Sequence, residues 1–241
     1  MTLTPSHQKE VARLLKDLNL PNLYKHYDWN GDTWEKGFPY LFRLEQDISK
    51  AARQYSLGKE HLMEIARWGG LPNPKRIDCP EPIKITLYTN DAPAEWLERE
   101  PENAVWILEG QTRGFGPTYC SKVLHFAVPS IFGAIDTRLV RTFGQGDPGA
   151  RPYKLLDLAV TRKGKRWEIK SRQAGWPREY GTWTTILNHI AKTLNEKGEE
   201  CPHPPQYLQS GLRKKGVWLP ADVETALFTF ASQEIQENTT V

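Results

Sequence analysis

The chain of 241 residues is poor in cysteine: it has only Cys79, Cys120 and Cys201, which lie far apart. An odd number of widely spaced cysteines is typical of reduced thiols in a cytosolic protein. Three cysteines are also too few for a four-cysteine zinc or iron–sulfur site. We therefore expect no metal held by cysteine ligands and a cytoplasmic location. We also expect no other metal and no cofactor.

Long apolar runs are missing as well. The longest is far shorter than the roughly 20 residues that a membrane-spanning helix needs, and the amino-terminal residues lack the basic-then-apolar pattern of a secretory signal. No internal repeat is present, which excludes a solenoid. The net charge is only +3, so any recognition of an acidic partner depends on how basic residues cluster. We expect a globular monomer without a membrane or an obligate protein partner.

Apolar residues recur at helical spacing along most of the chain. Helices are expected around residues 11–18, 41–51, 62–66, 94–97, 105–108, 120–127, 183–194 and 223–230. Pro21 and Asn22 should end the first helix, and Asp222 should cap the last helix. A β-like run at 83–89 and a hairpin of 155–160 with 167–169 are also expected. The sequence therefore predicts a mostly α fold with a small β-hairpin element.

Two segments stand out between the expected helices. Residues 24–40 are rich in tyrosine and tryptophan and are interpreted as an ordered loop of unassigned role. Residues 145–152 are rich in turn formers and are the best candidate for a boundary between lobes. Basic runs occur at 162–166 and 213–215. Such runs are usually solvated, but they are also candidates for contacts with phosphate groups.

The most informative stretch is 103–141. A helix ending at Gly110 is followed by Gly114-Phe115-Gly116 and by a second helix, which makes a helix-hairpin-helix pattern over residues 103–128. Glycines permit a positive φ and a close backbone approach, and Phe115 should point inward. The unpaired amides of the turn and of the second helix would then face outward, where they suit a phosphate oxygen.

Asp136 follows this hairpin within residues 133–141, whose sequence is GAIDTRLVR. The combination resembles the helix-hairpin-helix DNA glycosylase superfamily, the group that includes endonuclease III-like and adenine-mismatch glycosylases. There a Gly-x-Gly hairpin is followed by an invariant aspartate in an apolar-Asp-x-x-apolar-x-Arg context. The resemblance implies a single two-lobed helical unit: residues 41–144 form one lobe and residues 1–40 with 145–241 the other.

The resemblance also implies an activity, the excision of a base extruded from double-stranded DNA, with Asp136 as the catalytic residue. Cleavage of an N-glycosidic bond builds positive charge on the sugar, and a carboxylate stabilises that charge or activates water. Asp136 could equally be a helix cap, and one aspartate can serve both purposes. Bifunctional members carry a lysine two residues after the second glycine, where this chain has Thr118. A monofunctional enzyme that leaves an intact abasic site is therefore expected.

Other site residues are expected near the motif. Trp68, Thr118 and Tyr119 are candidates for contacts with the substrate, although a tryptophan more often packs in the core. The candidates for binding the DNA backbone are Arg113, Gly114, Gly116 and Lys122. Lys122 lies one turn beyond Thr118 and is also a weaker candidate for the missing amine. Tyr119 and His125 lie off the helix face that carries Cys120, so they could face the pocket or the DNA, with a place at the surface or at the edge of the core equally open.

Two other functions stay open. Asp157 on one strand and Glu168-Ile169-Lys170 on the next would match many magnesium-dependent nucleases, in which two carboxylates hold the metal. The pattern is common by chance, and the core sheet of such nucleases is missing. A non-catalytic helix-hairpin-helix DNA-binding protein is the third candidate, against which the aspartate argues. The sequence does not identify the base, and it leaves open repair or defence against phage DNA with modified bases. A bacterial protein of any of these kinds would associate with the nucleoid.

Overall fold

The computed structural model describes residues 2–145, 152–164 and 166–237. These residues are mostly helical and carry three two-stranded antiparallel sheets, which confirms the expected mostly α class. Among the helices of these ranges, none is long and apolar enough to cross a membrane. The buried apolar side chains form one continuous core.

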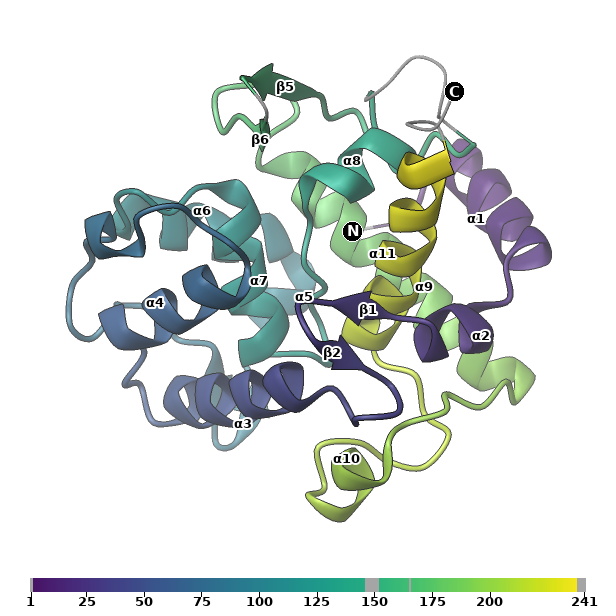
Figure 1. Ribbon diagram of the computed structural model, residues 1–241, viewed down its shortest axis with the longest axis horizontal. Helices are drawn as coiled ribbons and strands as arrows, with labels where there is room; N and C mark the ends of the chain where they lie inside the picture. Colours follow the sequence, from purple (N-terminus) through teal and green to yellow (C-terminus); the bar gives the residue numbers. More distant parts are fainter. Residues whose placement is uncertain (1, 146–151, 165, 238–241) are drawn as a thin grey trace.

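One group of helices surrounds α11, on the right of Figure 1. Its members are α1 (Pro5–Asp17), α2 (Leu20–Lys25), α8 (Thr137–Phe143), α9 (Arg178–Lys197) and α11 (Pro220–Glu237). Helix α11 packs against α2, α8 and α9, and α1 packs against α9. The long helix α9 ends where Gly198 takes a left-handed conformation with φ of 71°, as glycine does most readily.

A second group surrounds α7, on the left of Figure 1. Its members are α3 (Pro39–Arg53), α4 (Lys59–Trp68), α5 (Trp96–Arg99), α6 (Pro101–Gln111) and α7 (Pro117–Ala127). Helix α7 packs against α3, α4 and α6, and α6 also contacts α9 of the first group. The 3-10 helix η1 (Pro74–Arg76) packs against α4, and the sheet of β3 (Tyr88–Thr89) with β4 (Ala92–Pro93) touches α3.

Three further elements complete the fold. The hairpin of β1 (Asp28–Trp29) and β2 (Asp32–Thr33) lies between the two groups of helices (Figure 1), and β2 contacts α3. The hairpin of β5 (Val160–Lys163) and β6 (Arg166–Ile169) contacts α8. Helix α10 (Pro205–Gln209) precedes α11. The β1–β2 hairpin brings part of the aromatic segment 24–40 to the junction of the two groups.

Several local expectations were wrong. The first helix ends before Pro21, as expected, but the segment after it is not wholly a loop: it begins with α2, and Pro21 stands in the first turn of that helix, where its missing N–H has no intrahelical partner to lose. Of the β-like run 83–89, only the last two residues form a strand. Asp222 is not the cap of α11 but lies in its first turn, where Oδ2 accepts a hydrogen bond from the Leu219 amide at 2.9 Å.

The proposed lobe boundary at 145–152 falls almost entirely on residues 146–151, which lie outside the described residues. Helix α8, which the boundary would assign to the lobe of residues 41–144, packs against α11, β5 and β6. The division into lobes stays a prediction.

The basic run 213–215 was expected at the surface, but Arg213 is 6% exposed. Its Nε lies 2.9 and 3.1 Å from the two carboxylate oxygens of Asp222, and its Nη2 donates to Glu45 at 2.9 Å. The guanidinium thus joins a carboxylate of α3 to a carboxylate of α11. Arg213 is therefore a structural residue at the junction of the two groups and not a contact for phosphate.

Candidate active-site pocket

Asp136 is the N-cap of α8. Its backbone is extended, and Oδ1 accepts hydrogen bonds from the amides of Arg138 and Leu139 at 2.9 and 3.0 Å. Oδ2 accepts no hydrogen bond from the described part of the chain. The capping role expected from the sequence is confirmed, and it occupies only one of the two oxygens. The side chain is 8% exposed, so the carboxylate is held in a defined position with one oxygen available to a ligand.

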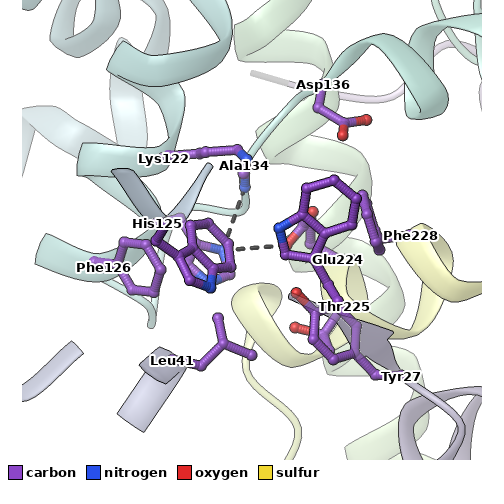
Figure 2. A pocket seen from close by; sticks show the side chains of 12 residues that line it. Tyr27, Leu41, Lys122, His125, Phe126, Ala134, Asp136, Glu224, Thr225 and Phe228 are labelled. Carbon is purple, nitrogen blue, oxygen red and sulfur yellow. Dashed lines mark hydrogen bonds and ion pairs between the residues drawn. The ribbon is translucent and has the colours of Figure 1, made fainter. Parts of the chain in front are cut away.

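A narrow pocket lies beside Asp136, at the junction of the two helix groups (Figure 2). Its apolar lining comes from Tyr27, Trp29, Leu41, Trp68, Phe126, Ala134 and Phe228, and its polar lining from Lys122, His125, Asp136, Glu224 and Thr225. The cavity has a volume of about 20 Å³, room for about one water molecule. A larger ligand requires the aromatic walls to move.

The aromatic segment 24–40 contributes Tyr27 and Trp29 to one wall of the pocket. Trp29 lines the pocket, and the guanidinium of Arg138 lies 4.5 Å from the centre of its ring. Asp32 is fully buried, and its Oδ2 accepts a hydrogen bond from Nε1 of Trp68 at 2.9 Å. Burial raises the pKa of Asp32, although its hydrogen bonds act in the opposite direction. The Asp32–Trp68 bond ties the β1–β2 hairpin to α4 across the pocket.

Lys122 reaches the pocket from α7 and is only 7% exposed. Its Nζ lies 4.6 Å from the ring centre of Trp68 and 5.7 Å from that of Tyr119. No carboxylate of the described residues lies within ion-pair distance of it. Burial lowers the pKa of Lys122, while Asp136 and Glu224 act in the opposite direction. Lys122, expected on the DNA-facing surface, is therefore an interior amine beside the candidate catalytic carboxylate.

Glu224 and His125 form a buried pair on the pocket wall. Oε2 of Glu224, on α11, lies 3.2 Å from Nδ1 of His125, on α7 (Figure 2). The same Nδ1 accepts a hydrogen bond from the Ala134 amide at 3.3 Å. Burial raises the pKa of Glu224 despite the opposing effect of His125. The pair joins the two helix groups from inside the pocket.

The α6–α7 hairpin (residues 101–127) has the expected form of two helices and a glycine-bearing turn. Gly114 adopts a φ of +70°, and a Cβ there would lie 3.0 Å from the Arg76 carbonyl oxygen, so glycine is required. Gly116, with a φ of −82°, caps α7 without needing that freedom, contrary to expectation. Phe115 is buried, as expected.

The turn of this hairpin is anchored on one side and open on the other. The Arg113 amide donates to the Asp78 carbonyl at 2.8 Å, and the Asp78 amide donates back at 3.2 Å. Among the described residues, no acceptor is present for the amides of Gly114, Phe115, Gly116 and Thr118. These amides, at the start of an eleven-residue helix, suit an anion such as a phosphate.

The remaining predicted site residues have separate locations. Thr118 and Tyr119 lie outside the pocket lining. Tyr119 instead donates from its hydroxyl to the Gly69 carbonyl at 3.0 Å, and burial raises its pKa to about 12. Arg113 has an exposed side chain. The structure thus unites Trp68, Lys122 and Asp136, and it adds Glu224 and Asp32, which no local sequence signal marked.

The magnesium-dependent nuclease requires an aspartate on the strand beside Glu168, and this expectation was wrong. Strand β5 begins only at Val160, and the residue that faces Glu168 is Thr161. Asp157 precedes the strand, and its carboxylate accepts a hydrogen bond from the Gln145 side chain. Lys170 follows the end of β6. The two carboxylates are therefore not opposite one another in the hairpin.

Within the described ranges, one group of metal-ligating side chains comes together: Cys201, His203 and Asp222 have donor atoms within 4.8 Å of one another. Sγ of Cys201 lies 3.6 Å from Nδ1 of His203. The carboxylate of Asp222 is already bound by Arg213. Only Cys201 and His203 of this group are then left as donors, fewer than the four ligands of a structural zinc site.

The pocket combines a carboxylate with a free oxygen, a second buried carboxyl group, an amine and aromatic walls. Next to these groups in sequence, the α6–α7 hairpin presents unpaired amides. Comparison of the chain with family models, with curated proteins and with solved structures finds no match. The chemistry of these residues therefore carries the functional inference.

Proposed function

We propose that the protein is a DNA glycosylase of the helix-hairpin-helix type, which hydrolyses the N-glycosidic bond of a base extruded from double-stranded DNA. One observation carries this proposal. Asp136 holds one oxygen on two amides of α8 and leaves the other free beside an aromatic pocket. A preorganised carboxylate in a water-poor site stabilises the positive charge that develops on the sugar, without reorganising during the reaction.

The α6–α7 hairpin supports the same proposal. Its free amides would bind a phosphate beside the target nucleotide, a contact that positions the DNA without reading its sequence. The nucleotide would rotate out of the stack, and its base would displace the walls formed by Trp29 and Trp68, on which it could stack. Asp136 would then face the anomeric carbon from the N-terminus of α8.

A panel of duplexes tests this function. Each duplex carries one uracil, mispaired, oxidised, alkylated or bulky modified base, and it is incubated with the protein in EDTA and then treated with alkali to cleave abasic sites. We expect strand breaks with at least one duplex, because a carboxylate needs no metal for this reaction. Release of a bulky modified base would point to defence against phage DNA, and release of a damaged or mispaired base to repair.

Two outcomes of the panel would contradict the proposal. Cleavage that requires magnesium and is lost in Glu168→Gln would identify the nuclease, in spite of the strand positions described above. Tight binding of every duplex without release of any base, in the presence or absence of metal, would identify a non-catalytic DNA-binding protein.

Lys122 favours a second candidate activity, cleavage of the DNA strand after base release. A neutral amine attacks C1′ of the sugar, water leaves to form an imine, and loss of a C2′ proton then expels the 3′ phosphate. Burial favours the neutral form of the Lys122 amine, and the amine lines the same pocket as Asp136. Thr118, at the position where bifunctional enzymes carry lysine, has a hydroxyl that cannot form an imine.

We expect the hydrolytic activity alone, so that sodium borohydride leaves the protein unlinked to abasic DNA. The measurement is a denaturing gel of protein and abasic duplex after reduction. A covalent adduct that disappears in Lys122→Met would contradict this expectation and establish the second activity. The pH dependence gives an independent check, since a lowered pKa makes the neutral amine available at lower pH. Trapping at Lys122 would rise with pH and level off below the ordinary lysine pKa of 10.5.

A further inference from the structure

The pocket contains two carboxyl groups in contrasting environments. Asp136 is held by amides at the N-terminus of α8, where hydrogen bonds satisfy a charged oxygen. Glu224 lies on α11, 7% exposed, with its nearest polar partner on α7. Two carboxyl groups in different surroundings are the usual acid and base of glycoside cleavage.

The side chain of Glu224 packs against the backbone of Gly133, which belongs to the sequence motif around Asp136. A Cβ added to Gly133 would lie 2.7 Å from Cβ of Glu224 and 2.4 Å from Cδ1 of Leu187. The glycine three residues before Asp136 therefore makes room for the Glu224 side chain. The two carboxyl groups are consequently positioned by the same short segment, residues 133–136.

The hydrogen bonds indicate where the proton of the Glu224–His125 pair resides. The Ala134 amide can only donate, so Nδ1 of His125, which it faces at 3.3 Å, must offer a lone pair. Oε2 of Glu224, 3.2 Å from this Nδ1, shares the same lone pair with the amide if the proton of the pair is on Glu224. Burial raises the pKa of Glu224 and favours this form, although the contact with His125 acts in the opposite direction. His125 is left with its proton on Nε2, which has no hydrogen-bond partner among the described residues.

We propose that the Glu224–His125 pair donates the proton that the departing base takes up, while Asp136 acts on the sugar. This inference rests on the proposed glycosylase function and deepens it. It assigns the enzyme to neutral bases, which leave poorly as anions and well once protonated, rather than to bases that already carry a positive charge.

The proton balance is as follows in the proposed reaction. The C1′–N bond breaks and its electron pair stays on the base nitrogen, which takes a proton from Nε2 of His125. The proton of Glu224 moves to Nδ1, which then gives up its contact with the Ala134 amide, so that the histidine stays neutral and Glu224 becomes a carboxylate. Water adds to C1′ and loses its proton to Asp136. After the base leaves, Asp136 releases that proton to solvent, and the Glu224–His125 pair regains one proton from solvent.

The test compares leaving groups. For the base that the duplex panel identifies, a series of ring substituents makes the base a progressively better leaving group. We expect Glu224→Gln to slow release of the unsubstituted base by about 10²–10³-fold. The loss should shrink steadily along the series, because a good leaving group needs no proton. The matched control is Glu179→Gln, which changes another buried glutamate, one that accepts a hydrogen bond from the Asp157 amide, and should leave every rate unchanged.

A second measurement uses the free protein. The infrared carbonyl band of a neutral carboxyl group at neutral pH should be lost in Glu224→Gln and kept in Glu179→Gln. A Glu224→Gln loss that is equal for all leaving groups, no loss at all, or the absence of this band in the native protein would overturn the proposal. Its failure is distinct from failure of the glycosylase function, since base release by the native protein that depends on Asp136 would persist.

Discussion

The Asp136→Asn variant is expected to lose base release by about 10³-fold and to unfold at the same temperature as the native protein. Asparagine is as good an N-cap as aspartate. Its carbonyl oxygen can keep the hydrogen bonds of 2.9 and 3.0 Å from the Arg138 and Leu139 amides. Only the negative charge is removed, so the variant separates the capping role of Asp136 from its chemical role.

The measurements are single-turnover base release and thermal unfolding on the same preparations. Asp136→Ala is the matched comparison: it should lose release to a similar extent and also about 1 kcal/mol of stability, because the cap itself disappears. Retention of native release rates by Asp136→Asn would remove the carboxylate from the chemistry and leave it only as a cap.

Arg213→Met is expected to lower the free energy of unfolding by about 3–5 kcal/mol, the usual effect of removing one partner from a buried ionic group. The guanidinium is 6% exposed and binds both Glu45 and Asp222. Without it, two carboxylates remain together in the interior with no positive charge between them. Because Glu45 lies on α3 and Asp222 on α11, the substitution weakens the contact between the two helix groups.

Urea denaturation monitored by tryptophan fluorescence provides the measurement. Lys214→Met is the control, since its exposed side chain follows Arg213 directly, and it should change stability by less than about 0.5 kcal/mol. Simultaneous replacement of Arg213, Glu45 and Asp222 by apolar residues should recover most of the loss, because no buried charge is then unpaired. A stable Arg213→Met single variant would show that the ionic group contributes little.

Features encoded in adjacent residues were predictable from the sequence. The helical spacing of apolar residues indicated α3, α4, α7 and α9, and the Gly-x-Gly turn indicated the α6–α7 hairpin. The capping role of Asp136 was predictable because an aspartate directly before a helix is a preferred N-cap, whereas its catalytic role was only implied by the resemblance and stays a prediction. Buried Phe115 followed from its place between two glycines.

Features that depend on distant partners were not predictable. Arg213 belongs to a basic run, and only the approach of Glu45 and Asp222 turns it inward. Lys122 has the spacing of a surface lysine, and its burial follows from Trp68 and Tyr119 closing over it. Glu224 carries no local signal at all, since its partner His125 is on another helix. Pro21 correctly marked a break after the first helix, but the short helix α2 that begins there was missed, because proline is also common in the first turn of a helix.

The tightness of the pocket has a consequence for selectivity. A space of about 20 Å³ excludes any base until the bond between Trp68 and Asp32, or the packing behind it, gives way. Under the proposed function, the free energy needed to open the pocket would be the same for every nucleotide. It would lower the apparent affinity in proportion to the fraction of molecules that are open. Nucleotides that leave the double helix cheaply would therefore be sampled most often. A closed pocket of this kind would therefore favour weakly paired nucleotides before any chemical group of the base is recognised.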